Sequence, residues 1–382
     1  MKKITILMLH LQHGGIEKQT ITLANQLAKR YEVEIISTYS MLYAPAYPVD
    51  ERVKITYLIN GRPNREEIKA AIRSKKLIEL IKQGIKAVKI LYLKKTLMVN
   101  AIKKLDCDCV LSTRIEFAEM LSAHAPKGVV TMTQEHLHDD SEEYVARAQE
   151  AFKGLDYLLV LCDGSRQNFF RWLKGNDHIK IVQIPNILEA VPEDTAALSG
   201  NNLVAVGRLH PVKNFGTLIE VFASVKKKIP DATLTIVGGG EEQGALEAKV
   251  KELGLEDSVK ITGMVSADEV KQYMLDADLY VMTSHTECFP MVLLEASSVG
   301  LPLVAFDVPV GPKAIIENGE NGILVPYEDR EKMSQEIIGI LENSSYKQKL
   351  ADGAKRMSYR YLADEIMPLW FKLFDGKGDD FK

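Results

Sequence analysis

The 382-residue chain is poor in cysteine and has no long apolar run. Its four cysteines (Cys107, Cys109, Cys162 and Cys288) show neither metal-ligand spacing nor a disulfide framework, so we expect reduced thiols. No stretch approaches the roughly 18 apolar residues of a membrane span. Residues 1–10 lack the small-residue cleavage site of a signal peptide and predict a first strand instead. These absences favour a cytoplasmic protein.

A surplus of positive charge is also missing from the chain as a whole. The formal net charge of −4 gives no reason to expect a nucleic-acid partner. Residues 61–104 differ, because they hold thirteen basic and three acidic side chains with apolar residues recurring among them. Such a basic amphipathic segment predicts either an element attracted to anionic lipid or a solvated helix whose apolar side packs on its own sheet.

The rest of the chain alternates short apolar strands with amphipathic helices, which predicts parallel sheets covered on both faces. Its length suggests two domains. We therefore expect an α/β protein with two Rossmann-like doubly wound domains facing a central cleft. The first domain is 1–188 with a helix and tail (363–382) returning to it, and the second is 189–362. The expected strands are 4–11, 33–37, 109–112, 129–133 and 157–161, then 202–206, 233–237, 259–262, 279–282, 303–306 and 322–325.

Two carboxylates, Glu287 and Glu295, lie eight positions apart across a predicted helix start. Pro290 suits the first helical position, so Glu287 falls in the preceding loop and Glu295 in the second turn. The free N–H groups of residues 291–293 would attract an anion. Carboxylates accept hydrogen bonds from hydroxyls. The segment therefore predicts a site for a molecule with phosphate and sugar hydroxyls, which describes a nucleotide sugar.

A second segment brings cations to the same predicted edge. Gly207, Arg208 and Lys213 follow a strand, and two fixed cations suit the growing charge of a diphosphate leaving group. Taken alone, an arginine and a lysine five positions apart in a loop are more often solvated surface residues, and the neighbouring glutamate segment favours the functional interpretation.

Glycine-rich turns follow two other strands. Gly14 and Gly15 would let backbone approach a ligand closely, although a purely structural turn is the default interpretation. Residues 238–244 look like a dinucleotide fingerprint with the wrong spacing and no acidic residue at the expected distance. We interpret Gly239 as part of a tight turn near the nucleotide.

Polar residues also follow the strand 129–133. His136, or His138 as the second choice, could contact a donor hydroxyl or steer a proton, and Glu135 accompanies them. An incidental polar loop explains the same residues. Asp106 and Asp108 precede a strand at the wrong edge for a metal site, so we expect no metal.

The chain resembles the retaining family 4 glycosyltransferases of the GT-B fold in four motifs and in their order along the sequence. These motifs are Gly14-Gly15, Glu135-His136, Gly207-Arg208 with Lys213, and Glu287 with Glu295. The resemblance covers almost the whole chain. It implies that Glu295 holds the ribose, that Glu287 contacts the donor sugar and that Arg208 and Lys213 bind the diphosphate. The other implied donor contacts are His136 near the reacting carbon, backbone at Cys288, Phe289, Pro290, Met291, Val292 and Leu293, and Val265 beside the base.

The resemblance also implies the reaction and its partners. We expect a metal-independent, retaining transfer of a hexose or N-acetylhexosamine from a UDP-linked donor, with no further cofactor. The acceptor, entering beside Glu135 and His138, would be a cell-surface polysaccharide, a teichoic acid or a lipid-linked saccharide. Residues 61–104 would then touch the inner face of the plasma membrane. Cys288 replaces a common glycine, which leaves the sugar open. Alternatives are a UDP-sugar 2-epimerase, an NAD-dependent oxidoreductase and a silent binding subunit.

Overall fold

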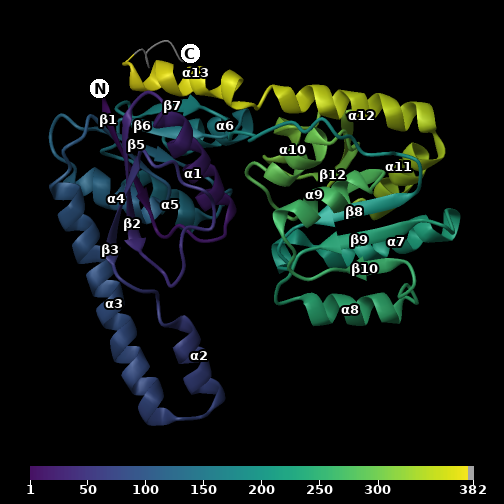
Figure 1. Cartoon of the computed structure of the whole chain (residues 1–382), viewed down its shortest axis with the longest axis horizontal. Helices are drawn as coiled ribbons and strands as arrows, with labels where there is room; N and C mark the ends of the chain where they lie inside the picture. Colours follow the sequence, from purple (N-terminus) through teal and green to yellow (C-terminus); the bar gives the residue numbers. More distant parts are fainter. Residues whose placement is uncertain (377–382) are drawn as a thin grey trace. The chain divides into compact units, whose positions relative to one another are not determined.

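The computed structural model describes residues 1–376, which form two compact units (Figure 1). The first unit comprises Met1–Val160, Asn168–Gln183 and the described residues from Lys372 onward. The second comprises Leu161–Gln167 and Ile184–Phe371. The end of the predicted returning segment therefore belongs to the first unit, where Lys2 Nζ donates a hydrogen bond of 2.6 Å to the carbonyl oxygen of Phe374. Residues 377–382 of that segment lie outside the described residues.

The first unit is built on a seven-stranded parallel sheet in the order β3-β2-β1-β4-β5-β6-β7. Its strands are β1 (Lys3–Met8), β2 (Glu32–Tyr39), β3 (Val53–Ile59), β4 (Cys109–Ser112), β5 (Val130–Gln134), β6 (Tyr157–Val160) and β7 (Lys180–Gln183). The sequence predicted five of these strands and missed β3 and β7. Both lie at the edges of the sheet, where a strand is only partly buried and its apolar pattern is weak.

The helices of this unit cover the sheet, with one long exception. They are α1 (Gly15–Leu27), α2 (Arg65–Arg73), α3 (Leu77–Lys103), α4 (Ile115–His124), α5 (Glu142–Ala151) and α6 (Asp163–Trp172), the first residues of which belong to the second unit. Figure 1 shows α3 running beyond the strands, with the short α2 beside the end that projects. The predicted basic amphipathic segment is therefore confirmed as a pair of helices.

The second unit holds a six-stranded parallel sheet in the order β10-β9-β8-β11-β12-β13. Its strands are β8 (Asn202–Val206), β9 (Thr233–Val237), β10 (Val259–Ile261), β11 (Leu279–Met282), β12 (Leu303–Asp307) and β13 (Gly322–Pro326). Its helices are α7 (Phe215–Lys228), α8 (Gln243–Glu252), α9 (Ala267–Leu275), α10 (Met291–Ser298), α11 (Arg330–Glu342), α12 (Ser344–Tyr359) and α13 (Ala363–Phe374), the last residues of which belong to the first unit. The 3-10 turns are η1 (Pro211–Lys213) and η2 (Pro312–Ala314). All six predicted strands are present.

Both sheets therefore have the strand order of doubly wound nucleotide-binding folds, and the predicted fold class is confirmed. In each sheet the order reverses beside the first strand, between β1 and β4 and between β8 and β11. Loops leave in opposite directions at such a point, which opens a crevice at the carboxyl ends of the strands. Across residues 1–376, no helix combines the length and apolar character that crossing a bilayer requires.

Candidate active site

The two predicted ligand-binding segments of the second unit meet at its switch point. Residues 207–214 follow β8 and residues 283–290 follow β11, and these two strands are neighbours in the sheet. The contact is direct, since the His285 N–H donates to the Val212 carbonyl oxygen at 2.8 Å and the Thr283 hydroxyl donates to the Asn214 carbonyl oxygen at 3.0 Å. The fold thus brings together residues 69 positions apart in the chain.

Glycines fix the path of the loop after β8. A Cβ atom on Gly238 would lie 2.0 Å from the carbonyl oxygen of Gly207, and Gly238 has a φ of +141°. A Cβ on Gly240 would lie 2.2 Å from the carbonyl oxygen of Leu209, whose N–H donates to the Gly239 carbonyl oxygen at 3.0 Å. The glycine-rich segment after β9 is therefore a tight turn that clamps the neighbouring loop, which gives its glycines a structural role.

The turn η1 places Lys213. The His210 imidazole accepts a hydrogen bond of 3.3 Å from the Val212 N–H and caps this turn. Asn214 then takes a left-handed conformation, with a φ of +53°, and begins α7. Asparagine tolerates this conformation better than most side chains. Lys213 is consequently held on a short, defined turn, whereas Arg208 is exposed beside it.

Lys213 and Glu287 form the central contact of the site. The Lys213 Nζ lies 2.6 Å from Glu287 Oε1, and the two side chains are 27% and 12% exposed. The Ser284 hydroxyl donates to the same carboxylate oxygen at 2.7 Å. A cation and a hydrogen-bonded carboxylate are thus held side by side at the crevice, where they can contact a phosphate and a hydroxyl respectively.

Glu295 lies on α10, close enough to Tyr280 that its charge, like that of Glu287, affects this tyrosine. Burial raises the pKa of Tyr280 above its ordinary range, and the charges of Glu287 and Glu295 raise it further. The Tyr280 hydroxyl is tied to β8, donating to the Val206 carbonyl oxygen at 3.2 Å. Both carboxylates therefore act on one buried phenol beneath the switch point.

The start of α10 differs in detail from the prediction. The helix begins at Met291, so Pro290 is the residue before the first turn rather than the first helical residue. The Leu293 N–H donates to the Pro290 carbonyl oxygen at 2.9 Å, so the predicted free donor at Leu293 is wrong. A tight first turn satisfies that donor within the chain. Met291 and Val292 remain as the N-terminal donors, and both are partly exposed.

Cys288 and Phe289 point into the protein. The Cys288 Sγ lies 3.8 Å from the Ser165 hydroxyl, and the Cys288 carbonyl oxygen accepts a contact of 3.7 Å from Cys162. The Phe289 ring packs edge-on against Tyr361, with ring centroids 5.7 Å apart. Any effect of Cys288 on a sugar must therefore come through the backbone of its loop. Val265 lies in the loop after β10, next to Met264. The Met264 side chain packs closely on Gly239, since a Cβ atom on that glycine would lie 2.8 Å from it.

In the first unit, Gly14 and Gly15 begin α1 at the other switch point. A Cβ on Gly14 would lie 2.0 Å from Glu17 Oε2, so the glycine leaves room for a carboxylate that folds back over it. Glu17 is buried, 3.2 Å from Arg114 and 3.7 Å from the His10 imidazole. Burial lowers the pKa of His10, and Arg114 lowers it further.

Glu135, His136 and His138 follow β5 of the same sheet. One Glu135 oxygen accepts the N–H groups of His136 and Leu137, each at 3.1 Å, and the other accepts the Tyr144 hydroxyl at 2.5 Å. This carboxylate therefore shapes the loop that carries His136. Burial lowers the pKa of His136 to about 4. Its Nε2 is buried without a hydrogen-bond partner among the described residues, and His138 is half-buried.

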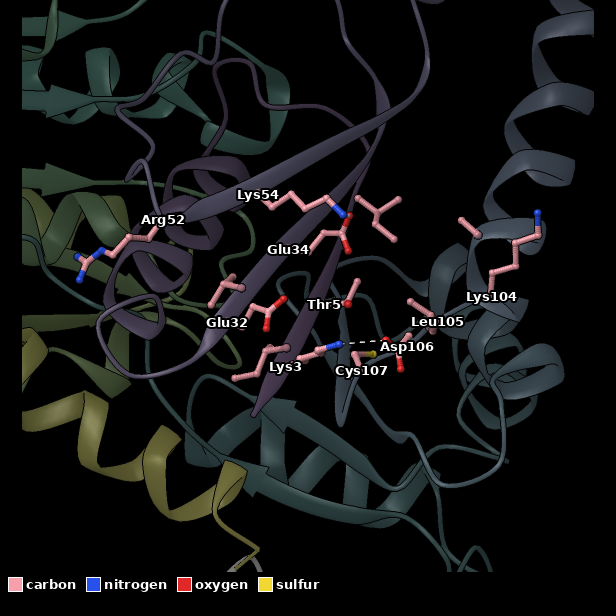
Figure 2. Close-up of a pocket in the computed structure, with 14 residues that line it drawn as sticks. Lys3, Thr5, Glu32, Glu34, Arg52, Lys54, Lys104, Leu105, Asp106 and Cys107 are labelled. Carbon is pink, nitrogen blue, oxygen red and sulfur yellow. Dashed lines mark hydrogen bonds and ion pairs between the residues drawn. The ribbon is translucent and has the colours of Figure 1, made fainter. Parts of the chain in front are cut away.

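The aspartates Asp106 and Asp108 lie at the opposite, amino-terminal edge of the first sheet. They bind Lys3, whose Nζ is 3.0 Å from Asp106 and whose N–H donates to Asp108 at 2.7 Å. A cavity of about 520 Å³ lies beside them and is lined by residues of β1, β2, β3 and the end of α3. Figure 2 shows the side chains that line it. Within residues 1–376, no three His, Cys, Asp or Glu side chains are grouped to hold a metal ion.

Sequence reasoning missed several polar residues at these edges. Arg114 lies two residues after β4, and its Nε is buried without a hydrogen-bond partner among residues 1–376. The Thr286 hydroxyl oxygen, next to Glu287, is buried without a partner among the same residues. Ser284 orients Glu287 and Tyr280 underlies both carboxylates. Arg114 could have been found by its place after a strand. The others depend on contacts that only the fold creates.

A doubly wound parallel sheet in each unit, with charged residues at the switch points, defines the GT-B fold, which solved structures of this type share. Residues 191–357 match the family model described as glycosyl transferases group 1. An uncharacterised glycosyltransferase of Haemophilus influenzae is 30% identical over 97% of this chain and 99% of its own length. The chain therefore belongs to the group 1 glycosyl transferases.

Other relatives extend this comparison. An exopolysaccharide phosphotransferase of Streptomyces coelicolor is 30% identical over 94% of the chain, which spans only 39% of that protein's length. Among solved structures, S. aureus TarM, in a complex with fondaparinux, alpha-GlcNAc-glycerol and UDP, superposes with a TM-score of 0.78. That match covers 98% of this chain and 100% of TarM at 16% identity, so it supports the fold alone.

Proposed function

We propose that this glycosyltransferase moves a hexose or N-acetylhexosamine from a UDP-sugar to a hydroxyl, without a metal and with retention of anomeric configuration. The observation that carries the proposal is the Lys213–Glu287 contact of 2.6 Å at the switch point of the second sheet. A fixed cation there can neutralise a leaving diphosphate, and the carboxylate can hold a sugar hydroxyl. UDP in the TarM complex supports uridine as the base of the donor.

The roles follow from the side chains. Lys213 and the exposed Arg208 bind the two phosphates, and the first N–H groups of α10 add donors to them. Glu295 accepts from the ribose hydroxyls and Glu287 from the donor sugar. The unpartnered Thr286 hydroxyl is a further candidate for a sugar contact, since a buried hydroxyl without a partner is costly. Gly239 and Val265 line the side of the base, and Phe289 and Cys288 hold the loop.

His136 acts as a neutral imidazole. Its lowered pKa keeps the ring uncharged at neutral pH, so it offers a donor and an acceptor nitrogen to the sugar. In the retaining reaction, the C–O bond to the diphosphate breaks and the acceptor hydroxyl attacks from the same face. The leaving phosphate oxygen takes the proton of that hydroxyl. Glu135 positions the loop, His138 lies on the acceptor's side, and the loop at Gly14 and Gly15 contacts the donor.

The acceptor belongs to the polysaccharide, teichoic-acid or lipid-linked class, and we place the reaction on the cytoplasmic side of the membrane. The exopolysaccharide named for the Streptomyces relative and the alpha-GlcNAc-glycerol in the TarM complex support this class.

A panel of UDP-, GDP- and ADP-sugars tests the donor by thermal shift. A ligand at 100 times its Kd stabilises the fold by about 2.7 kcal/mol. We expect the UDP-sugars to raise the unfolding temperature and Lys213→Ala to remove most of that shift. NMR of the product should show the anomeric configuration of the donor. Donor interconversion without acceptor would indicate an epimerase, and binding of NADH without UDP an oxidoreductase. Either result refutes the proposal.

A further inference from the structure

The helix α3 exposes a row of large apolar side chains that no other described residue covers. Its members, which we call the α3 stripe, are Ile78, Ile81, Ile85, Val88 and Tyr92, and each is between 56% and 84% exposed. Their spacing of three and four residues places them on one side of the helix, within about 80° of its circumference at 100° per residue. Single exposed apolar residues are ordinary, but a continuous row marks an interaction surface.

The opposite side of α3 is the one attached to the protein. Gln83 is buried and accepts a hydrogen bond of 2.9 Å from Asn64. Lys94 lies 2.6 Å from Glu116 of α4. Both residues lie roughly 160° to 180° around the helix from the centre of the stripe. The stripe therefore faces away from the unit's own core. Of the two alternatives that the sequence allowed, an apolar side packed on the sheet and a free apolar surface, the structure has the second.

Lysines border the stripe on one flank. Lys82, Lys86 and Lys89 are exposed and lie within about 120° of its centre. The turn between α2 and α3 adds Lys75 and Lys76 at the projecting end. The only acidic residue of α3, Glu79, accepts a hydrogen bond from Gln83 at 2.6 Å. The surface is thus apolar with a cationic border.

We propose that the α3 stripe and its lysines dock on an anionic membrane surface. Apolar side chains would enter the boundary between headgroups and acyl chains, and the lysines would meet lipid phosphates. Charge decides against a second copy of the chain as the occupant. Two such helices side by side in an antiparallel pair would bring lysine borders together without acidic partners, and like charges repel. The chain as a whole is acidic, with a net charge of −4, so the attraction must be local to this surface.

The length of α3 suits this role. Its 27 residues span about 40 Å, and the stripe occupies about four turns of that length. A row of this extent can lie along a bilayer surface while its far end, with Met98 and Ile102 in the core, anchors it to the unit. The proposal goes beyond the transfer reaction and does not depend on it.

Sedimentation with vesicles tests the proposal without donor or acceptor. We compare vesicles of phosphatidylcholine alone with vesicles in which about one lipid in three is phosphatidylglycerol, which is anionic. The wild type should bind the anionic vesicles at low salt and lose binding as salt is raised, because the Debye length falls from roughly 30 Å at 0.01 M to 10 Å at 0.1 M. Each lysine near the surface is worth about a fivefold change in affinity.

The variants separate the two halves of the surface. Changing Lys82, Lys86 and Lys89 together to glutamine should weaken anionic-vesicle binding by at least about tenfold. The matched control changes the exposed lysines of α7 and α8 (Lys227, Lys228 and Lys251) to glutamine, with the same change in net charge and no expected effect.

The apolar half is tested by Ile81→Ser with Ile85→Ser, which should weaken binding while leaving the circular dichroism spectrum unchanged, since both side chains are exposed. Equal loss in the α7–α8 control, or no vesicle binding by the wild type at low salt, overturns the proposal. So does a concentration-dependent dimer in ultracentrifugation that the isoleucine variant abolishes, because a second copy would then cover the stripe. An inactive transferase that still binds vesicles would refute only the proposed function.

Discussion

Replacing Lys213 with alanine is the most direct test of the site. Lys213 Nζ lies 2.6 Å from Glu287 Oε1, and the lysine is the one cation that the structure fixes against a site carboxylate in the described second unit. If it neutralises the leaving diphosphate, its loss removes charge stabilisation that matters most in the transition state. Removing one preorganised donor of this kind costs about 10²–10³ in kcat, or roughly 3–4 kcal/mol.

The effect on stability should be much smaller. The lysine side chain is 27% exposed, and Ser284 still donates to Glu287 at 2.7 Å when the lysine is gone. A partly exposed pair contributes about 1 kcal/mol or less. We therefore expect the unfolding temperature to fall by about 2–4 °C at most. The loss of activity should exceed the loss of stability for a simple reason. The substrate loses its cation when Lys213 is removed, whereas Glu287 keeps its hydrogen bond from Ser284.

Lys249→Ala is the matched control. Lys249 pairs with Glu220, and these side chains are 30% and 32% exposed. The exposed fraction of Lys249 is therefore similar to the 27% of Lys213. Loss of Lys249 should cost similar stability and leave turnover unchanged. The assay measures release of UDP with saturating donor, together with thermal unfolding of each variant. A Lys213→Ala enzyme with kcat within threefold of the wild type would refute the diphosphate role.

Three further changes test other parts of the site. Glu295→Gln should weaken UDP binding about tenfold or more in calorimetry, as expected for a lost charged hydrogen bond, whereas Glu252→Gln on exposed α8 should not. The pKa of His136 is about 4 in the folded protein and 6.5 in the unfolded chain, so the unfolded state binds more protons between these pH values. As the pH drops from 6.5 to 4, the free energy of unfolding should therefore fall by about 3 kcal/mol more in the wild type than in His136→Gln. An equal pH dependence of the two proteins in denaturant melts would contradict the burial of the ring. Gly238→Ala should destabilise by more than 2 kcal/mol, because its Cβ would lie 2.0 Å from a carbonyl oxygen, while Gly244→Ala, with open space around it in α8, should stabilise by about 0.5–1 kcal/mol in the same urea titrations.

The sequence was most informative where the chain is buried on both sides. Central strands such as Leu279–Met282 are continuous apolar runs ended by polar loops, so their positions could be predicted to within a few residues. The edge strands Val53–Ile59 and Lys180–Gln183 were missed, since partial burial relaxes the apolar pattern. The start of α10 was predicted one residue early because proline is favoured at the first helical position but also tolerated just before it.

By itself, the sequence determined the fold class, the order of the motifs and the charges available at the ends of the strands, because these depend on local pattern. It could not show that Lys213 meets Glu287, that Ser284 donates to the same carboxylate, or that Glu135 holds the His136 loop. The first of these contacts arises from strand order, which places β8 beside β11 although many residues separate them, and the others depend on the path that each loop takes in the folded chain. Likewise, the amphipathic pattern of α3 left its apolar side ambiguous. Only the tertiary structure decided that this side faces away from the core, because the helix is attached by its opposite face.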